Sequence, residues 1–330
     1  MTPILLIHQG ALGDLILSLP ALYALRVFSP QASWTMAGNP DTLSLLKDRF
    51  YVQKVVSIHG REWAALMDED LNLPEPFQQF LASFDQAYLF AKHKPQAMIR
   101  GLNRAGLIKT IWLPSLPDEG QPFSLTARQK EILVSHHLPW AETDKTIFPS
   151  PEDLEEGRDY LARLGGQGPW LAIHPGSGSP HKNWPWERFR ETAQAISRQS
   201  RLRPVFIIGP VEKDTFPEMA EKMSLLGFPV LRDVPLTILT GVLSHCAGYL
   251  GNDSGVSHLA AALGIPAVIL FGPTDPEIWG PRGKKVMILR PENPCAPCSL
   301  EAARTCPEKV CWDSLSVRQV LDRIFSSFQT

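Results

Sequence analysis

The chain has 330 residues, more than one hydrophobic core usually holds, so we expect two domains of about 150 residues each. Hydrophobic residues make up 44% and charged residues 20%, a balance typical of a globular protein and not of a disordered one. The net charge of −2 gives no indication of a nucleic-acid partner, and no apolar run approaches the roughly 20 residues of a membrane span.

The N-terminal half predicts a parallel sheet with helices on its faces. Residues 4–7 indicate a short buried strand, a turn with Gly10, Gly13 and Asp14 follows, and apolar residues then recur at helical spacing over 15–28. Alternation of strands and helices is the pattern of a doubly wound α/β domain. Three further strands are predicted in this half, at 33–37, 52–58 and 84–90.

The C-terminal half repeats this alternation more clearly. Its predicted strands are 170–174, 204–208, 247–251 and 266–271. Its predicted helices are about 186–199, a helix starting near 212, and 254–263. The proline-rich stretch 143–151 is the best linker. We therefore predict domains at 1–148 and 149–313, with a C-terminal helix at about 314–330 that can pack back on the first domain.

Three loops follow predicted strands and open predicted helices, where helix N-termini present free N–H groups to anions: 9–14, 174–182 and 251–257. The first does not have the glycine spacing of a dinucleotide fingerprint, because Leu12 and Leu15 stand where glycines are needed. A NAD-dependent dehydrogenase is therefore not expected. Asp14 either caps its helix or serves as a catalytic carboxylate, and its spacing leaves both roles open.

The other two loops suit a diphosphate. The loop 174–182 contains glycines and serines and ends in Lys182. It can therefore offer backbone N–H groups, hydroxyls and a cation to phosphate oxygens. The alternative is a plain surface loop. In the third loop, Gly255 inside a first helical turn indicates close approach of a ligand. Asp253 or Ser254 can equally be a helix cap, and His258 a histidine of the core.

Four segments together resemble glycosyltransferase family 9, the lipopolysaccharide heptosyltransferases: 10–26, 173–189, 207–214 and 251–281. The resemblance implies the GT-B fold, an α/β architecture of two Rossmann-like doubly wound domains with a cleft between them. It implies an N-terminal domain that binds the acceptor and a C-terminal domain that binds the nucleotide sugar. The reaction it implies is inverting transfer of a heptose from ADP-heptose to the lipopolysaccharide inner core.

The resemblance also assigns roles by position. Asp14 matches the catalytic base, Glu212 matches the residue that hydrogen-bonds the nucleotide ribose, and Asp253 matches the carboxylate that contacts the donor sugar. The residues matched to donor binding are Gly13, Ser177, Gly178, Lys182, Glu212, Asp253, Ser254, Gly255 and His258. Helix N-termini and Lys182 can stabilise the departing diphosphate, so we expect neither a metal nor a cofactor.

A basic segment lies between Asp85 and Asp118, where the sequence has no acidic residue. Its cations are Lys92, Lys94, Arg100, Arg104 and Lys109. They form either a solvated basic face or an acceptor site, because the lipopolysaccharide core carries carboxylates and phosphates that such side chains pair. We assign the first four to acceptor binding. The same segment can also hold the protein at the anionic inner face of the inner membrane.

The cellular compartment of the protein determines whether its cysteines are expected to form disulfides. No Lys or Arg precedes Arg26, and Asp14 stands where the apolar region of a signal peptide would begin, so we expect a cytoplasmic protein. Disulfides are disfavoured there. Four cysteines cluster with C-x2-C-x7-C-x4-C spacing, at Cys295, Cys298, Cys306 and Cys311. The cluster is either a structural zinc site or a set of ordinary thiols.

Other functions remain open at this point. A glycosyltransferase with another nucleotide sugar or another acceptor fits the same residues. A sugar-nucleotide epimerase of similar fold would act on the donor without any acceptor. A non-catalytic nucleotide-sugar binding protein would have no need of a base such as Asp14.

Overall fold

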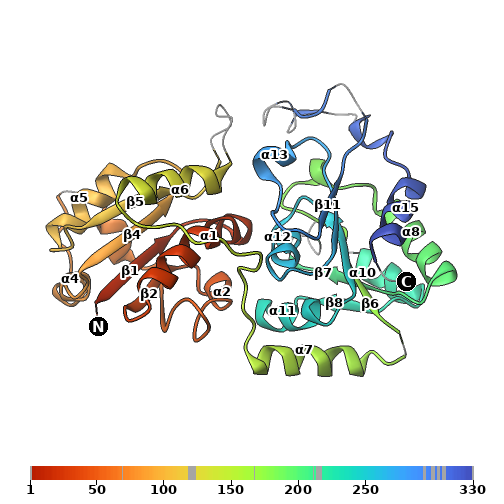
Figure 1. Ribbon diagram of the computed structural model, residues 1–330, viewed down its shortest axis with the longest axis horizontal. Coiled ribbons are helices and arrows are strands. Elements are labelled where there is room, and N and C mark those ends of the chain that lie inside the picture. Colours follow the sequence, from red (N-terminus) through yellow and green to blue (C-terminus); the bar gives the residue numbers. More distant parts are fainter. Residues whose placement is uncertain are drawn as a thin grey trace. The chain divides into compact units, whose positions relative to one another are not determined.

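The computed structural model describes residues 2–68, 70–117, 124–166, 168–210, 212, 218–292, 295–298, 302, 305–306 and 310–328. The chain divides into two compact units, Met1–Phe148 and Pro149–Thr330. In each of them, parallel strands form a sheet with helices packed on its faces (Figure 1).

Within its described residues, the first unit has a sheet of five parallel strands in the order β3-β2-β1-β4-β5. The strands are β1 (Pro3–His8), β2 (Ser33–Gly38), β3 (Lys54–Ser57), β4 (Gln86–Ala91) and β5 (Thr110–Pro114). The helices are α1 (Leu12–Phe28), α2 (Pro40–Leu43), α3 (Arg61–Ala65), α4 (Glu75–Ala82), α5 (Gln96–Arg104) and α6 (Leu125–Ser135). The predicted strands of this half are all present, and β5 was not predicted.

Helix α1 begins three residues earlier than the apolar spacing predicts. Ala11 is the extended N-cap residue, and the helix starts at Leu12. Asp14 is therefore the third helical residue and not the cap, and its carboxylate Oδ2 accepts a hydrogen bond from the Ala11 N–H at 2.9 Å. Leu15 and Leu19 are fully buried, so the apolar face starts one turn after the helix does.

The second unit has, within its described residues, six parallel strands in the order β11-β10-β9-β6-β7-β8. They are β6 (Trp170–His174), β7 (Arg203–Ile208), β8 (Val230–Arg232), β9 (Gly248–Asn252), β10 (Ala267–Leu270) and β11 (Val286–Leu289). The helices are α7 (Pro151–Arg163), α8 (Trp186–Gln199), α10 (Met219–Leu225), α11 (Leu236–Ser244), α12 (Gly255–Ala262), α13 (Pro276–Trp279) and α15 (Val317–Ser327), with short 3₁₀ helices at Pro180–Lys182 and Val310–Trp312. The helix predicted to start near 212 lies mostly outside the described residues.

Helix α7 starts directly after the unit boundary, inside the stretch that the sequence analysis treated as a linker. Ser150 is its N-cap, and the Asp153 carboxylate accepts from the Ser150 N–H at 2.8 Å while the Ser150 hydroxyl accepts from the Asp153 N–H at 3.1 Å. This reciprocal capping fixes the start of the helix at Pro151. The helix then packs on α11 (Figure 1).

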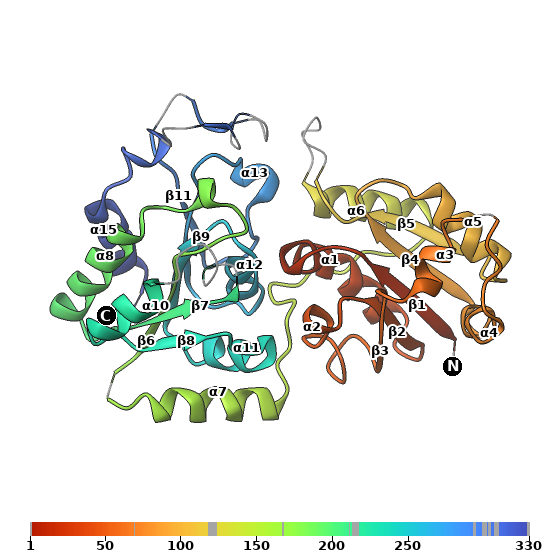
Figure 2. The ribbon, with the colours of Figure 1, turned by 180° about the vertical axis from the view of Figure 1, so that it is seen from behind.

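The C-terminal helix packs within the second unit. Val320 and Ile324 of α15 are fully buried in the same core as Trp184 and Phe189, and α15 lies beside α8 in both ribbon views (Figure 2). The main-chain carbonyl of Leu315, just before the helix, accepts from the Trp184 indole at 3.1 Å. The apolar face of α15 is thus buried by α8 and β10 of its own unit.

Candidate functional site

The polar residues of the second unit gather at the carboxyl edge of its sheet. Strand β6 ends at His174 and β9 ends at Asn252, and the two strands are neighbours with His174 paired to Gly251. The strand order reverses between them, because β7 and β8 continue on one side and β10 and β11 on the other. Open α/β sheets bind ligands at such a reversal point, so the carboxyl ends of β6 and β9 are the expected ligand site.

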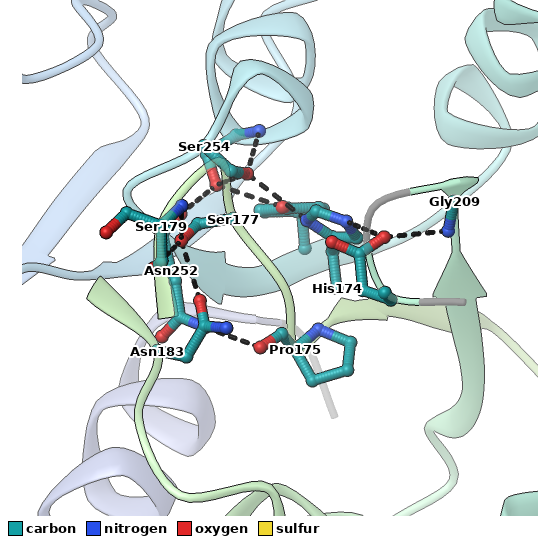
Figure 3. A network of polar contacts seen from close by, with 11 residues as sticks. His174, Pro175, Ser177, Ser179, Asn183, Gly209, Asn252 and Ser254 are labelled. Atoms are coloured by element: carbon teal, nitrogen blue, oxygen red, sulfur yellow. Dashed lines mark hydrogen bonds and ion pairs between the residues drawn. The ribbon is translucent and has the colours of Figure 1, made fainter. Parts of the chain in front are cut away.

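His174 connects a buried carboxylate to the start of helix α12 (Figure 3). Its Nε2 lies 3.5 Å from Glu212 Oε2, and its Nδ1 lies 3.2 Å from the hydroxyl of Ser254. The Gly209 N–H donates to the same Glu212 oxygen at 2.8 Å. Burial raises the pKa of Glu212, but the hydrogen bond and charge of His174 and the Gly209 N–H outweigh it, so this pKa lies below its ordinary value. Glu212 is therefore an ionised, buried acceptor of hydrogen bonds.

Asn252 holds both ends of the loop that follows β6. Its side-chain amide donates to the Pro175 carbonyl at 2.7 Å (Figure 3). Its side-chain carbonyl accepts from the Trp184 N–H at 3.1 Å. Gly176 lies in this loop directly against Glu212, and a Cβ there would collide with the carboxylate. The sequence analysis did not single out Asn252, because nothing in the pattern distinguishes a loop-fixing amide from its neighbours.

The Ser177 hydroxyl is engaged inside the loop. It donates to the Ser179 carbonyl at 2.8 Å, accepts from the Ser179 N–H at 3.2 Å and lies 2.7 Å from Asn183 Oδ1 (Figure 3). Gly178 is open, since no atom lies within 4 Å of the position that its Cβ would take. Ser177 therefore shapes the loop, and Gly178 marks the side from which a ligand can approach. Their contacts with a donor remain predictions.

Lys182 and Asp253 form an ion pair. Lys182 Nζ lies 2.7 Å from Asp253 Oδ2, and the Thr274 hydroxyl donates to the same oxygen at 2.8 Å. The side chain of Asp253 is only 6% exposed, whereas that of Lys182 is 27% exposed. The structure thus brings together two residues that lie far apart in the sequence, and it leaves the lysine accessible to an anion.

Helix α12 starts beside this pair. Ser254 is its N-cap and accepts from the Ser257 N–H at 3.3 Å, and Gly255 is its first residue. The first N–H groups of a helix have no partner within the helix, so α12 offers donors for an anion at the same edge as Lys182. His258 is buried, and burial lowers its pKa to about 4 despite the opposing effect of Asp253. A neutral imidazole adds no positive charge, which favours a core role for His258.

Two buried histidines should make the protein less stable in mild acid. Burial lowers the pKa of both His8 and His258 from 6.5 to about 4. Between these values the unfolded chain binds more protons than the folded chain, so stability is complete above pH 6.5 and falls as the pH decreases toward 4. Each histidine should remove about 2 kcal/mol of unfolding free energy between pH 7 and 5. Urea unfolding at both pH values measures this loss; equal stability at the two pH values would contradict it.

In the first unit, Asp14 and Gly13 lie in the first turn of α1, and Asp14 is partly exposed. A Cβ on Gly10 would collide with the Cβ of Asp14 and with the ring of His8, so only glycine permits this close turn. The turn is also one wall of a pocket of about 530 Å³. Its other walls come from residues at the carboxyl ends of β2 and β3 and from helices α3 and α5, among them Asn39, His59, Trp63 and Met98.

The four cations of the basic segment that were assigned to acceptor binding lie on two elements, the loop after β4 and helix α5. Lys92 and Lys94 are exposed in the loop after β4, at the carboxyl edge of the first sheet. Arg100 and Arg104 lie on α5, and the Arg104 guanidinium donates to the main-chain carbonyl of Asp68 at 2.8 Å. None of the four predicted acceptor residues lines the 530 Å³ pocket, whereas Met98 from the same helix does.

The four cysteines of the cluster differ in burial. Cys311 is buried in the core of the second unit, Cys298 and Cys306 are partly exposed, and Cys295 is exposed. Burial raises the pKa of Cys298, as do the neighbouring Cys295 and Cys306, so the thiols lie near one another. In the part of the chain that the structure describes, no three His, Cys, Asp or Glu side chains are arranged to hold a metal ion. The described helices also include none that is long and apolar enough to span a membrane.

Two units, each a parallel sheet with helices on its faces, form the GT-B fold, and in the second unit the polar loops described above lie where the strand order reverses. The family model of glycosyltransferase family 9 (heptosyltransferase) matches residues 127–309, more than half of the chain. The chain belongs to this family, and it is a glycosyltransferase. The match includes the loop 174–182, Glu212 and the start of α12.

Similar proteins agree with this assignment. Lipopolysaccharide heptosyltransferase 1 of Pseudomonas aeruginosa is 25% identical over 317 residues, which cover 89% of this chain and 85% of the relative. The crystal structure of the family 9 glycosyltransferase from Veillonella parvula superposes with a TM-score of 0.78 at 19% identity, covering 97% of this chain and 95% of that one. The ADP-heptose lipopolysaccharide heptosyltransferase II of Escherichia coli superposes with a TM-score of 0.74 at 17% identity, covering 99% and 98%. These structures support the GT-B fold.

Proposed function

We propose that the chain transfers a heptose from ADP-heptose to an acceptor of the lipopolysaccharide inner core, with inversion at the anomeric carbon. The observation that carries this proposal is the convergence of Lys182, the start of α12 and the buried carboxylates Glu212 and Asp253 at one sheet edge. The donor and acceptor follow the relatives, whose names specify ADP-heptose and lipopolysaccharide.

The second unit would hold the donor. Lys182 and the first N–H groups of α12 would neutralise the diphosphate and stabilise it as the leaving group. Glu212 would accept hydrogen bonds from the ribose hydroxyls, because it is an ionised acceptor held by His174. Asp253 would accept from hydroxyls of the transferred sugar while its other partner, Thr274, keeps it in place.

The first unit would hold the acceptor and the base. Asp14 would take the proton from the acceptor hydroxyl as this oxygen attacks the anomeric carbon, and the C–O bond to the diphosphate would break on the opposite face. The 530 Å³ pocket beside the turn 9–11 would hold the acceptor sugar. Lys92 and Lys94, exposed at the same sheet edge, would pair with more distant carboxylates or phosphates of a lipid-linked acceptor or of the cytoplasmic leaflet.

A panel of nucleotide sugars tests the donor. ADP and ADP-heptose should raise the melting temperature, because a ligand at 100 times its Kd adds about 2.7 kcal/mol of stability. UDP-sugars should give a smaller shift at equal concentration. Transfer to a lipopolysaccharide-core acceptor, followed by mass spectrometry, then measures the reaction itself. Stabilisation by UDP-sugars alone would contradict the heptosyltransferase proposal and leave the GT-B fold intact.

The same assay separates the proposal from an epimerase. An epimerase consumes the nucleotide sugar in the absence of acceptor, whereas a transferase of this kind needs the acceptor for turnover. We expect no change in the donor sugar when the acceptor is left out.

Turnover should not require a metal ion. Lys182 and the α12 N-terminus already supply positive charge at the diphosphate position, so a chelator such as EDTA should leave kcat within about twofold of the untreated enzyme. Elemental analysis of the same sample shows whether zinc accompanies the cysteines. Loss of turnover on chelation, restored by one metal, would contradict this expectation.

A further inference from the structure

A buried polar network lies beneath the first turn of α1. His8, Ser18 and Gln129 are each at most 2% exposed. The Gly10 N–H donates to His8 Nδ1 at 3.1 Å, and His8 Nε2 lies 3.4 Å from Ser18 Oγ. The Gln129 amide donates to Ser18 Oγ at 3.4 Å and to the carbonyl at the end of β5 at 2.8 Å. The network thus joins β1, α1 and α6.

The protons of this network can be assigned. His8 Nδ1 accepts from the Gly10 N–H and so carries no proton, and burial keeps the ring neutral by lowering its pKa to about 4. The single proton is then on Nε2, which donates to Ser18 Oγ. The Ser18 hydroxyl itself donates a hydrogen bond to the main-chain carbonyl of Asp14, at 2.9 Å. Both ring nitrogens of His8 are therefore engaged, although the residue lines the 530 Å³ pocket.

These hydrogen bonds hold the turn 9–14 at two of its residues, Gly10 and Asp14. His8 holds Gly10 directly, and through Ser18 it holds the main chain of Asp14. Between these points the Ala11 N–H donates to the Asp14 carboxylate at 2.9 Å. The turn is also tightly packed, since a Cβ on Gly10 would collide with both His8 and Asp14. A shift of the His8 ring would therefore move the carboxylate.

We propose that His8 is a positioning residue, which acts with Ser18 to hold the turn 9–14 so that the Asp14 carboxylate stays oriented for proton removal. The proposal rests on the proposed function, because it concerns the residue assigned there as the base. It also excludes His8 as an acid or base, because neither of its ring nitrogens is available to a substrate. The competing view is that His8 only fills space against Phe90, whose ring centroid lies 5.8 Å away.

A double-mutant cycle distinguishes the two views. His8→Leu removes both hydrogen bonds, and His8→Asn keeps an acceptor near the Nδ1 position but does not reach Ser18. We expect His8→Leu to lower kcat by about 10- to 100-fold, because misplacement of a catalytic group costs this much. His8→Asn and Ser18→Ala should lower kcat less, and donor affinity should change by no more than about twofold in all three.

The decisive comparison is the effect of His8→Leu in the Asp14→Asn variant. If His8 acts through Asp14, His8→Leu should change the residual kcat there by no more than about twofold, since coupled residues are not additive. An equal loss of kcat in both backgrounds would overturn the proposal. If His8→Leu does not fold, His8→Asn takes its place in the cycle.

Amide hydrogen exchange gives a readout that does not depend on activity. In the full chain without substrate, the Gly10 and Ala11 amides should exchange about tenfold faster in His8→Leu than in the wild type, because the turn opens more often. The increase should be smaller in His8→Asn, which keeps an acceptor for the Gly10 N–H but loses the hydrogen bond to Ser18. Unchanged exchange at Ala11 would overturn the proposal. A wild-type protein that does not use ADP-heptose would contradict the proposed function alone, because the exchange experiment still tests the role of His8.

Discussion

Asp14→Asn should lower kcat by about 10²- to 10⁴-fold while the protein stays folded, because the substitution removes the only proton acceptor that the mechanism assigns to the acceptor hydroxyl. The amide oxygen of asparagine can still accept from the Ala11 N–H, the hydrogen bond that the Asp14 carboxylate makes at 2.9 Å. Loss of the charge near the N-terminus of α1 should cost only about 0.3 to 1 kcal/mol of stability. Initial-rate kinetics and urea unfolding measure the two effects separately.

Asp153→Asn is the matched control. Asp153 occupies the same third position of helix α7, and its carboxylate accepts from the Ser150 N–H at 2.8 Å. It should reproduce the change in stability without the loss of kcat. Donor affinity should be little changed in both variants, because Lys182, the α12 N-terminus, Glu212 and Asp253, which are proposed to hold the donor, all belong to the second unit. Turnover by Asp14→Asn within a few-fold of the wild type would mean that Asp14 only stabilises its helix and that another group is the base.

Lys182→Ala should weaken ADP binding by about 10- to 100-fold, which corresponds to the 1.5 to 3 kcal/mol of a hydrogen bond to a charged group. Two effects act in the same direction. The diphosphate loses its cation, and the nearly buried Asp253 loses the ion pair at 2.7 Å and then repels the phosphates. Isothermal titration with ADP measures the loss, and the thermal shift by ADP should decrease in parallel.

Two further variants sharpen this test. Lys222→Ala removes an exposed lysine of the same unit, paired with Glu218 at 2.7 Å, and should leave ADP affinity unchanged. Lys182→Ala combined with Asp253→Asn should recover part of the lost affinity, because the repelling charge is also removed. An unchanged Kd for ADP in Lys182→Ala would show that the diphosphate binds elsewhere.

The core strands were predictable from sequence because they are fully buried in parallel sheets. Residues 4–7 and 170–173 form continuous apolar runs, glycine-containing turns follow within a few residues, and both runs are strands in the structure. Two elements were missed for different reasons, β5 and α7. Strand β5 has only three consecutive apolar residues, 111–113, and its first three residues are only partly buried, whereas α7 carries acidic and basic residues on most of its surface.

By itself, the sequence predicted two doubly wound α/β domains and the loops that follow their strands, because glycine turns and helix starts are encoded by residues close together in the chain. The GT-B fold and the family followed from the resemblance of four segments to glycosyltransferase family 9. Only the tertiary structure decided how these loops are joined. The pairs Lys182–Asp253 and His174–Glu212, the loop-fixing amide of Asn252 and the network from His8 to Gln129 all connect residues from different strands and helices. The pairing of such distant side chains depends on strand order and register, which a local pattern does not contain.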